Sequence, residues 1–172
     1  KDKTKLIAYP GNRRNPNFLI PAIVTEIGSY AFEGCTGLTK VELPSKVEII
    51  WNQAYKDCTG ITEFSLPEGL KTVYAYAFEK CTGLNSIKLP DSIETMGFRV
   101  FLNCTNLTEV NYPKNWVNTP GGNGSYNNEH GGIFYGCTNL RNLIIPEGVT
   151  EIPANAFQNC GNLEMVTLSE SV

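Results

Sequence analysis

The residues of this 172-residue chain with the clearest chemical potential are its six cysteines. They stand at positions 35, 58, 81, 104, 137 and 160, so the spacing is constant except for one longer gap between Cys104 and Cys137. Regularly spaced thiols could form disulfides or bind zinc. Each cysteine lies in the same short phrase, as in Ala31-Phe32-Glu33-Gly34-Cys35 and Ala77-Phe78-Glu79-Lys80-Cys81. What these thiols can do therefore depends on where the repeat places them.

The repeat predicts a solenoid. A fixed period of about 20 to 50 residues is typical of chains in which each unit buries its apolar face against its neighbours. If each unit begins at a proline, five units have one common length and the fifth in order is longer. We expect a single domain, 1–172, that contains the repeats 21–43, 44–66, 67–89, 90–112, 113–145 and 146–168.

Each unit contains a Leu-x-x-Val-x-Leu type of segment just before the next proline, for example Leu38 to Leu43. Its apolar-x-apolar ending predicts a strand with one buried face, and proline then ends the hydrogen-bond ladder. Since every coil returns in the same direction, we expect these strands to form one parallel sheet along the whole chain.

The rest of each unit carries further apolar columns. We expect the column of aromatic residues to form a stacked rib through the interior, made of Phe32, Tyr55, Phe78, Phe101, Phe134 and Phe157. The Ala-Phe-x-x-Cys stretch around it is too short for a stable helix alone, so we expect a single helical or 3₁₀ turn on the side opposite the sheet.

A unit of the form Pro-x-x-Val-x-x-Ile-Gly-x-x-Ala-Phe-x-x-Cys-Thr-x-Leu-x-x-Val-x-Leu resembles the BspA-like class of leucine-rich repeats, found in bacterial surface and secreted proteins. The resemblance covers residues 21–168. It implies a right-handed β/α superhelix with the parallel sheet on its concave face, residues 1–20 as an N-terminal half-repeat or cap, and attachment to host matrix or cell-surface proteins. Departures are Trp51 in place of the Gly28 type, Thr119 at an apolar position and the expansion of the fifth unit.

An extracellular setting would favour three disulfides, but the repeat geometry opposes them. In-register residues of successive coils lie about 4.8 Å apart with parallel side-chain directions, whereas a disulfide requires Cβ atoms near ~3.8 Å and a twisted dihedral angle. Zinc would need a tetrahedral cluster, and a column without Cys-x-x-Cys or a neighbouring histidine does not supply one. We favour six buried, reduced thiols and expect no cofactor or metal.

The expansion of the fifth unit, residues 117–132, is rich in glycine and asparagine and predicts a loop. Glu129 and His130, the single histidine, could in principle act as an acid and base pair. No nucleophile is spaced to join them, and no phosphate-binding glycine motif is present, so we do not expect an enzyme. A neutral insertion and a recognition loop both remain open.

The outward side chains of the strand segments form what we call the strand face, our candidate partner-binding surface. It consists of Lys40, Glu42, Glu63, Ser65, Ser86, Lys88, Glu109, Asn111, Asn142, Ile144, Met165 and Thr167. The first four coils are polar with alternating charge, whereas Ile144 and Met165 are apolar although the repeat does not require it. The face is either a solvated sheet or a binding surface with an apolar anchor.

Composition limits the partners. The net charge is -3, and five of the fourteen basic residues lie in the first fourteen positions. Because no aromatic residues interleave with them, we read them as solvated charges and expect no nucleic acid. No apolar run approaches the roughly 18 residues needed to cross a bilayer. A signal peptide is not evident, and Val172 falls at the Val24 position of a further turn, so we read the chain as a piece of a longer extracellular or cell-surface protein. An adhesion or protein-binding module is favoured over a passive spacer.

Overall fold

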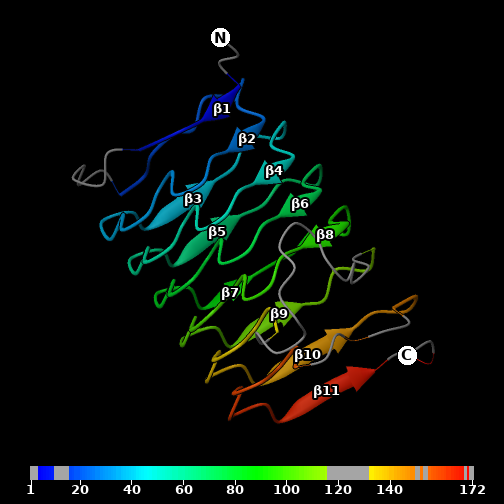
Figure 1. Ribbon diagram of the computed structural model, residues 1–172. Helices are drawn as coiled ribbons and strands as arrows, with labels where there is room; N and C mark the ends of the chain where they lie inside the picture. The colour runs from blue at the N-terminus through cyan, green and yellow to red at the C-terminus, as the bar shows by residue number, and fades with distance from the viewer. Residues whose placement is uncertain are drawn as a thin grey trace.

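The computed structural model describes residues 4–9, 16–115, 132–149, 152, 155–168 and 170. In these residues the chain forms a stack of similar coils that runs from one terminus to the other (Figure 1). The strands in chain order are β1 (Lys5–Leu6), β2 (Glu26–Ile27), β3 (Lys40–Glu42), β4 (Ile49–Ile50), β5 (Glu63–Ser65), β6 (Thr72–Val73), β7 (Ser86–Ile87), β8 (Thr95–Met96), β9 (Glu109–Asn111), β10 (Asn142–Ile145) and β11 (Met165–Leu168).

The strands expected before each proline are present and pair in parallel, as predicted. Lys40 of β3 is paired with Glu63 of β5, the equivalent residue of the next unit. Glu109 of β9 is likewise paired with its equivalent Asn142 of β10, across the longer fifth unit. The extra residues of that unit therefore leave the register of the strands intact.

The sheet differs from the expectation in one respect, because it divides into a two-stranded part, β3-β5, and a four-stranded part, β7-β9-β10-β11. The interruption coincides with Phe64, the aromatic residue at the inward position of β5. Its ring stands edge-on to the rings of Tyr55 and Phe78, with centroids 4.8 and 4.9 Å away. Equivalent inward positions in β3 and β7 hold the smaller Val41 and Ile87.

A second parallel sheet, which the sequence analysis did not anticipate, consists of the two-residue strands β1-β2-β4-β6-β8. Its strands keep the same register between coils, since Glu26 is paired with Ile49 and Thr72 with Thr95. The second residue of each strand from β2 to β8 is buried in the core. One of the expected apolar columns is therefore the inner face of a sheet.

The single helical or 3₁₀ turn expected around the Ala-Phe-x-x-Cys stretch is not found in the described residues. Consecutive turns take its place. The N–H of Phe32 donates to the carbonyl of Ala54 in the next coil at 2.8 Å, whereas the N–H of Cys35 donates back to the carbonyl of Phe32 at 3.1 Å. Gly34 and Asp57, which lie inside this stretch of the first two coils, have φ of 69° and 57°. A right-handed helix requires negative φ throughout, so these residues exclude a helix over the whole stretch.

The predicted aromatic rib is confirmed. Successive rings from Phe32 to Phe157 stack with interplanar angles of 5° to 10° and centroid distances of 4.8 to 5.9 Å. Tyr9 adds another ring, stacked on Phe32 at 5.2 Å. Parallel, offset rings at such distances contribute both buried area and favourable ring contacts. The core is thus a continuous column that grows by one ring per coil.

Some expectations concern residues outside the described set. They are the departure Thr119, the loop up to residue 131 with Glu129 and His130, the basic residues Lys1, Lys3, Arg13 and Arg14, and Val172.

Candidate functional site

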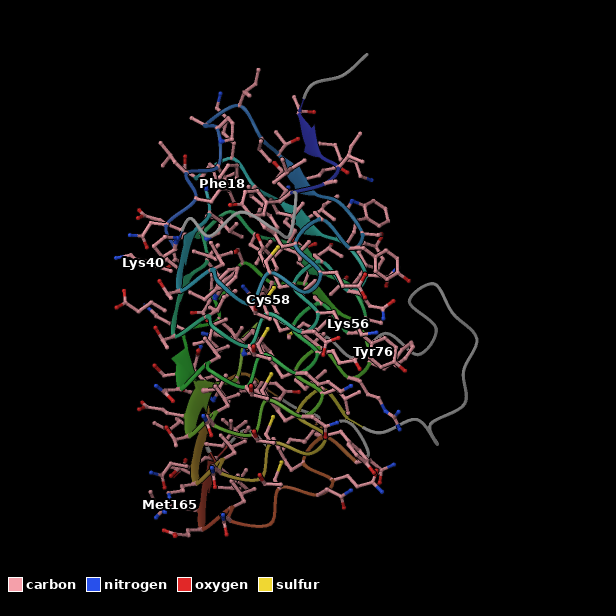
Figure 2. All side chains as sticks on the ribbon, turned by 90° about the vertical axis from the view of Figure 1, so that its left-hand side faces the viewer. Phe18, Lys40, Lys56, Cys58, Tyr76 and Met165 are labelled. Atoms are coloured by element: carbon pink, nitrogen blue, oxygen red, sulfur yellow. The ribbon has the colours of Figure 1, made fainter. Side chains whose placement is uncertain are left out.

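The strand face is assembled as the alternation of the strands dictates. In β3, Val41 is buried while Lys40 and Glu42 are exposed, and β5 repeats the pattern. Of the twelve candidate residues, eleven are exposed and Asn111 is half-buried. Figure 2 shows Lys40 and Met165 along the same edge of the solenoid, far apart along its length. The candidate residues therefore form one long surface rather than a compact site.

Asn111 differs from the other residues of the strand face because its amide group is already bound. Its Oδ1 accepts from the backbone N–H of Leu89 at 2.7 Å, and its Nδ2 donates to the carbonyl of Leu89 at 2.8 Å. The side chain thus takes over the backbone pairing between two coils. Asn111 has little capacity left to bind a partner.

Most charged side chains of the strand face form no ion pair with one another among the described residues. Lys40 Nζ lies 3.3 Å from Glu63 Oε2, and both side chains are exposed. No ion pair joins Glu42, Lys88 or Glu109 to any described residue. Exposed pairs such as the first contribute only about 0 to 1 kcal/mol. The charged groups of this face are therefore accessible to a partner.

Apolar side chains are exposed near both ends of the strand face. Ile144 is 62% and Met165 55% exposed, on the adjacent strands β10 and β11. At the other end Leu19 is 85% exposed, and the bridge between Asn17 and Lys40 places it in the row of Glu42. Leu19 is not among the residues predicted from the strand pattern. A comparison of Asn17-Phe18-Leu19-Ile20 with the equivalent segment one repeat later, Lys40 to Leu43, would have found it.

The cysteines form a column of thiols inside the solenoid (Figure 2). All six are free, and all but Cys160 are buried. Cys58 Sγ donates to the carbonyl of Phe32 in the preceding coil at 2.9 Å. The later cysteines make equivalent hydrogen bonds to carbonyls of the coil before them, at 3.0 to 3.2 Å. They are Cys81, Cys104, Cys137 and Cys160. The predicted burial is therefore confirmed for five of the thiols, and Cys160 is less buried than expected.

Burial favours the protonated form of three of these thiols, whereas a hydrogen bond with Cys58 lowers the pKa of Cys35. Burial raises the pKa of Cys104 and Cys137 well above the usual value and that of Cys160 to about 11. A neutral thiol is a poor nucleophile and a poor metal ligand. No cluster of three or more His, Cys, Asp or Glu side chains suited to a metal is present among the described residues.

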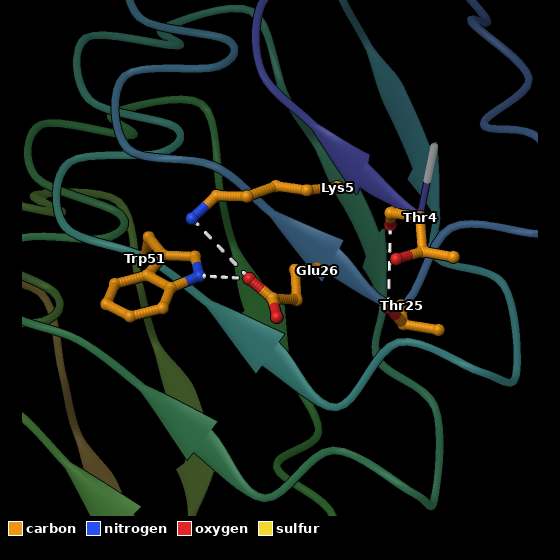
Figure 3. Close-up of polar contacts among 5 residues, drawn as sticks. All are labelled: Thr4, Lys5, Thr25, Glu26 and Trp51. Carbon is orange, nitrogen blue, oxygen red and sulfur yellow. Dashed lines mark hydrogen bonds and ion pairs between the residues drawn. The ribbon is translucent and has the colours of Figure 1, made fainter. Parts of the chain in front are cut away.

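A network of polar and aromatic contacts covers the outer side of the second sheet (Figure 3). Trp51 Nε1 donates to Glu26 Oε2 at 2.8 Å, and Lys5 Nζ lies 3.5 Å from the same oxygen. Lys5 Nζ also lies 4.2 Å from the centre of the Trp51 ring. The other side of that ring stacks on Tyr74, with centroids 4.5 Å apart and an interplanar angle of 6°. The departure from glycine at Trp51 is thus accommodated outside the core.

Within the described ranges, the protein contains no helix of the length and apolar character that a membrane span requires.

A family model described as a BspA type leucine-rich repeat region, with six copies, matches residues 9–130 and 126–172. No curated protein matches the chain in sequence.

Solved structures of three bacterial proteins are similar to the chain. A leucine-rich repeat protein of Treponema pallidum is 28% identical with a TM-score of 0.78, over 97% of this chain and 78% of that one. A leucine-rich repeat protein of Bacteroides ovatus is also 28% identical, with a TM-score of 0.77, over 91% of this chain and 38% of that one. The pneumococcal vaccine antigen PcpA is 28% identical with a TM-score of 0.69, over 84% of this chain and 34% of that one.

Proposed function

The chain belongs to the BspA-type leucine-rich repeat family, and from this premise we propose that it is a non-catalytic recognition or adhesion module of a bacterial surface or secreted protein. The partner is a host-matrix or cell-surface protein, and the strand face is where it docks. An extended, regular surface of this kind is what solenoids offer to protein partners.

One observation carries the proposal. The strand face presents charged and apolar side chains that have no partner within the described part of the chain, in particular Lys88, Glu109, Ile144 and Met165. Apolar side chains exposed beside free charges are typical of a docking surface with an anchor and a polar surround. Lys88 and Ile144 lie two coils apart, about 10 Å, so one partner segment can reach both.

The extracellular location is part of the same proposal. One similar structure is that of a vaccine antigen, which supports exposure at the cell surface. Free cysteines do not oppose this location, because hydrogen-bonded thiols in the core are shielded from oxidants.

The experiment is a binding titration against immobilised extracellular-matrix protein and against intact cells. The double variant Lys88→Glu with Met165→Glu should lose at least tenfold in affinity, because it reverses one charge and places another in the anchor. Lys46→Glu with Ile23→Glu is the matched control, since both residues are exposed but lie outside the strand face. Equal binding by the two double variants would exclude the strand face.

The alternative is a passive spacer that holds another domain away from the cell. It is favoured by the regular stack of coils, which could serve a mechanical purpose without any partner (Figure 1). A spacer predicts no saturable binding by the wild-type chain to any matrix or cell preparation. The wild-type titration therefore separates the two functions before any variant is made.

A further inference from the structure

The aromatic residues of the protein are distributed unevenly over its surface. Six aromatic side chains of the described residues do not belong to the core, and all follow the short strands of the second sheet or lie in the adjoining turns. We call them the aromatic band: Tyr30, Trp51, Tyr74, Tyr76, Phe98 and Tyr135. None of the twelve residues of the strand face is aromatic. In Figure 2, Tyr76 lies on the side away from Lys40 and Met165.

Contacts between coils involve five of the six members of the band. Trp51 stacks on Tyr74, the ring of Tyr76 stands edge-on to that of Phe98 at 4.9 Å, and the Arg99 guanidinium lies 4.9 Å from the centre of the Tyr135 ring. The repeat requires none of these residues, because equivalent positions in other coils hold glycine, serine, glutamine or glutamate. The band is therefore an addition to the solenoid rather than part of its core.

Both ends of the Trp51 and Tyr74 stack adjoin a glycine. On the Trp51 side the equivalent position in the preceding coil is Gly28, and the side chain of Lys5 crosses it to cover the indole. On the Tyr74 side the equivalent residue of the following coil is Gly97. Its N–H donates to the carbonyl of Val73, just as the N–H of Tyr74 donates to the carbonyl of Ile50 in the coil before it. The face of the Trp51 ring that points toward the coil of Gly28 is thus covered by the side chain of Lys5.

On the other side of the stack Tyr74 is half-buried, and the equivalent residue of the following coil, Gly97, has no side chain. A Cβ on Gly97 would lie 2.4 Å from the backbone nitrogen of Ala75, so this position cannot carry a side chain that would cover the ring. Among the described residues, Trp51 is the one ring or cation in contact with Tyr74. Tyr30, at 52% exposure, has no ring contact within the same residues. The Tyr30 ring is therefore exposed to a ligand, and the half-buried Tyr74 ring has one face packed on Trp51.

The chemistry of the band points to a neutral carbohydrate. Aromatic faces pack against the C–H face of a sugar ring, while phenol hydroxyls donate to and accept from sugar hydroxyls. Two of the nearby cations already contact other groups of the chain, since Lys5 pairs with Glu26 and the Arg99 guanidinium lies on Tyr135. Tyr30 and Tyr74 belong to the coils 21–43 and 67–89, which are two steps of the stack apart, about 9.6 Å along its axis. An extended polysaccharide of several sugar rings spans that distance.

We propose that the aromatic band is a glycan-binding surface, with Tyr30 and Tyr74 as the stacking platforms for an uncharged, extended polysaccharide. It is separate from the strand face, so one molecule can hold a protein and a glycan on different sides. This site does not depend on the protein partner proposed above.

The test is native affinity electrophoresis of the whole chain in gels that contain hydroxyethylcellulose, galactomannan or dextran, with heparin as the anionic comparison. At least one neutral polysaccharide should retard the wild-type protein. Tyr30→Ala and Tyr74→Ala should each weaken the retardation about three- to tenfold. The strand-face variant Lys88→Glu with Met165→Glu serves as the matched control and should migrate like the wild type.

Three outcomes would overturn the proposal: no retardation by any neutral polysaccharide, retardation by heparin alone, or retardation that neither tyrosine variant weakens. Loss of a matrix-protein interaction in the tyrosine variants, without glycan binding by the wild type, would assign the band to a protein instead. Because Tyr30 is exposed, its alanine variant should keep the fold, which unchanged thermal unfolding would verify.

Discussion

The coil 67–89, in the middle of the stack, and the coil 146–168 share one pattern but differ in burial. At the two inward positions of the middle strand, Ile87 is 4% and Leu89 1% exposed. In the later coil, Val166 is 38% and Leu168 53% exposed. The aromatic and cysteine positions follow the same trend, since Phe157 and Cys160 are half-buried whereas their middle counterparts are fully buried.

This difference shows that a coil does not bury its own side chains. The residue types are nearly the same in both coils, so the change must come from the neighbours on either side. Stability, thiol chemistry and the effect of a mutation should therefore depend on the place of a residue along the stack. Measurements on both coils can test whether burial by the neighbouring coils explains the difference.

The largest difference should come from the aromatic rib. Phe78→Ala should cost about 3 to 5 kcal/mol in the free energy of unfolding, the range for a large side chain removed from a packed core. Phe157→Ala should cost clearly less, because among the described residues its ring stacks on Phe134 alone, and because it is partly exposed. Urea unfolding followed by circular dichroism measures both. Equal losses would show that the two coils are equally well packed.

Thiol labelling should separate Cys160 from Cys104. The pKa of Cys160 is about 11, so its thiolate fraction, and with it the labelling rate, should rise about tenfold per pH unit from pH 7 to 10, whereas an unfolded cysteine should level off above about pH 8.5. Cys104, fully buried with its pKa raised further, should stay unlabelled while the chain is folded. Mass spectrometry of labelled peptides gives both rates. Faster labelling of Cys104 would contradict the comparison.

The same shifts imply a loss of stability at alkaline pH. A raised pKa means that the folded chain keeps protons which the unfolded chain has already released. The free energy of unfolding should therefore be at its full value below about pH 8.5 and fall above it. Unfolding of a Cys104→Ala variant should show a weaker dependence over the same range.

A smaller effect is expected at Tyr55, whose ring lies in the rib between Phe32 and Phe78. Its hydroxyl is buried without a hydrogen-bond partner among the described residues, which costs about 1 to 3 kcal/mol. Tyr55→Phe should therefore raise the free energy of unfolding by about 1 kcal/mol, while Tyr30→Phe, at an exposed position, should not change it. Destabilisation by Tyr55→Phe would show that the hydroxyl is satisfied.

The smallest effect belongs to the surface. Lys40→Gln removes the ion pair with Glu63 on the strand face and should change the free energy of unfolding by less than about 1 kcal/mol, a difference that salt should abolish. Unfolding curves at low and high salt test this. A large, salt-independent loss would mean that the strand face is part of the stable structure rather than a free surface.

Much of the fold could be predicted because its signals are periodic. The column that contains Phe78 and the alternation that exposes Lys40 and Glu42 both recur once per repeat, and both are present as expected. The second sheet escaped prediction because its very short strands, such as Thr72–Val73, cannot show alternation. The turns were not predicted because Tyr30 and Gln53 have positive φ, which their residue types do not indicate.

The candidate site was predictable in its position but not in its details. Alternation alone placed Lys88 and Met165 on the outer side of the sheet. It could not reveal that Asn111 would bind the backbone of Leu89, because that contact depends on the neighbouring coil. Nor could it reveal that Lys5 would reach across Gly28 to Trp51, since the two belong to coils that are not adjacent.

The register between successive coils is constant, so equivalent residues follow one another along the solenoid at a fixed spacing. Since equivalent residues of successive units are directly paired, duplication or deletion of a unit such as 67–89 would move every later surface residue by about 4.8 Å and leave the local contacts of the remaining coils in place. The separation between Leu19 and Ile144 can therefore change in whole coils only. Unequal recombination between repeats can therefore lengthen or shorten the binding surface during evolution without a change in the turns of any coil.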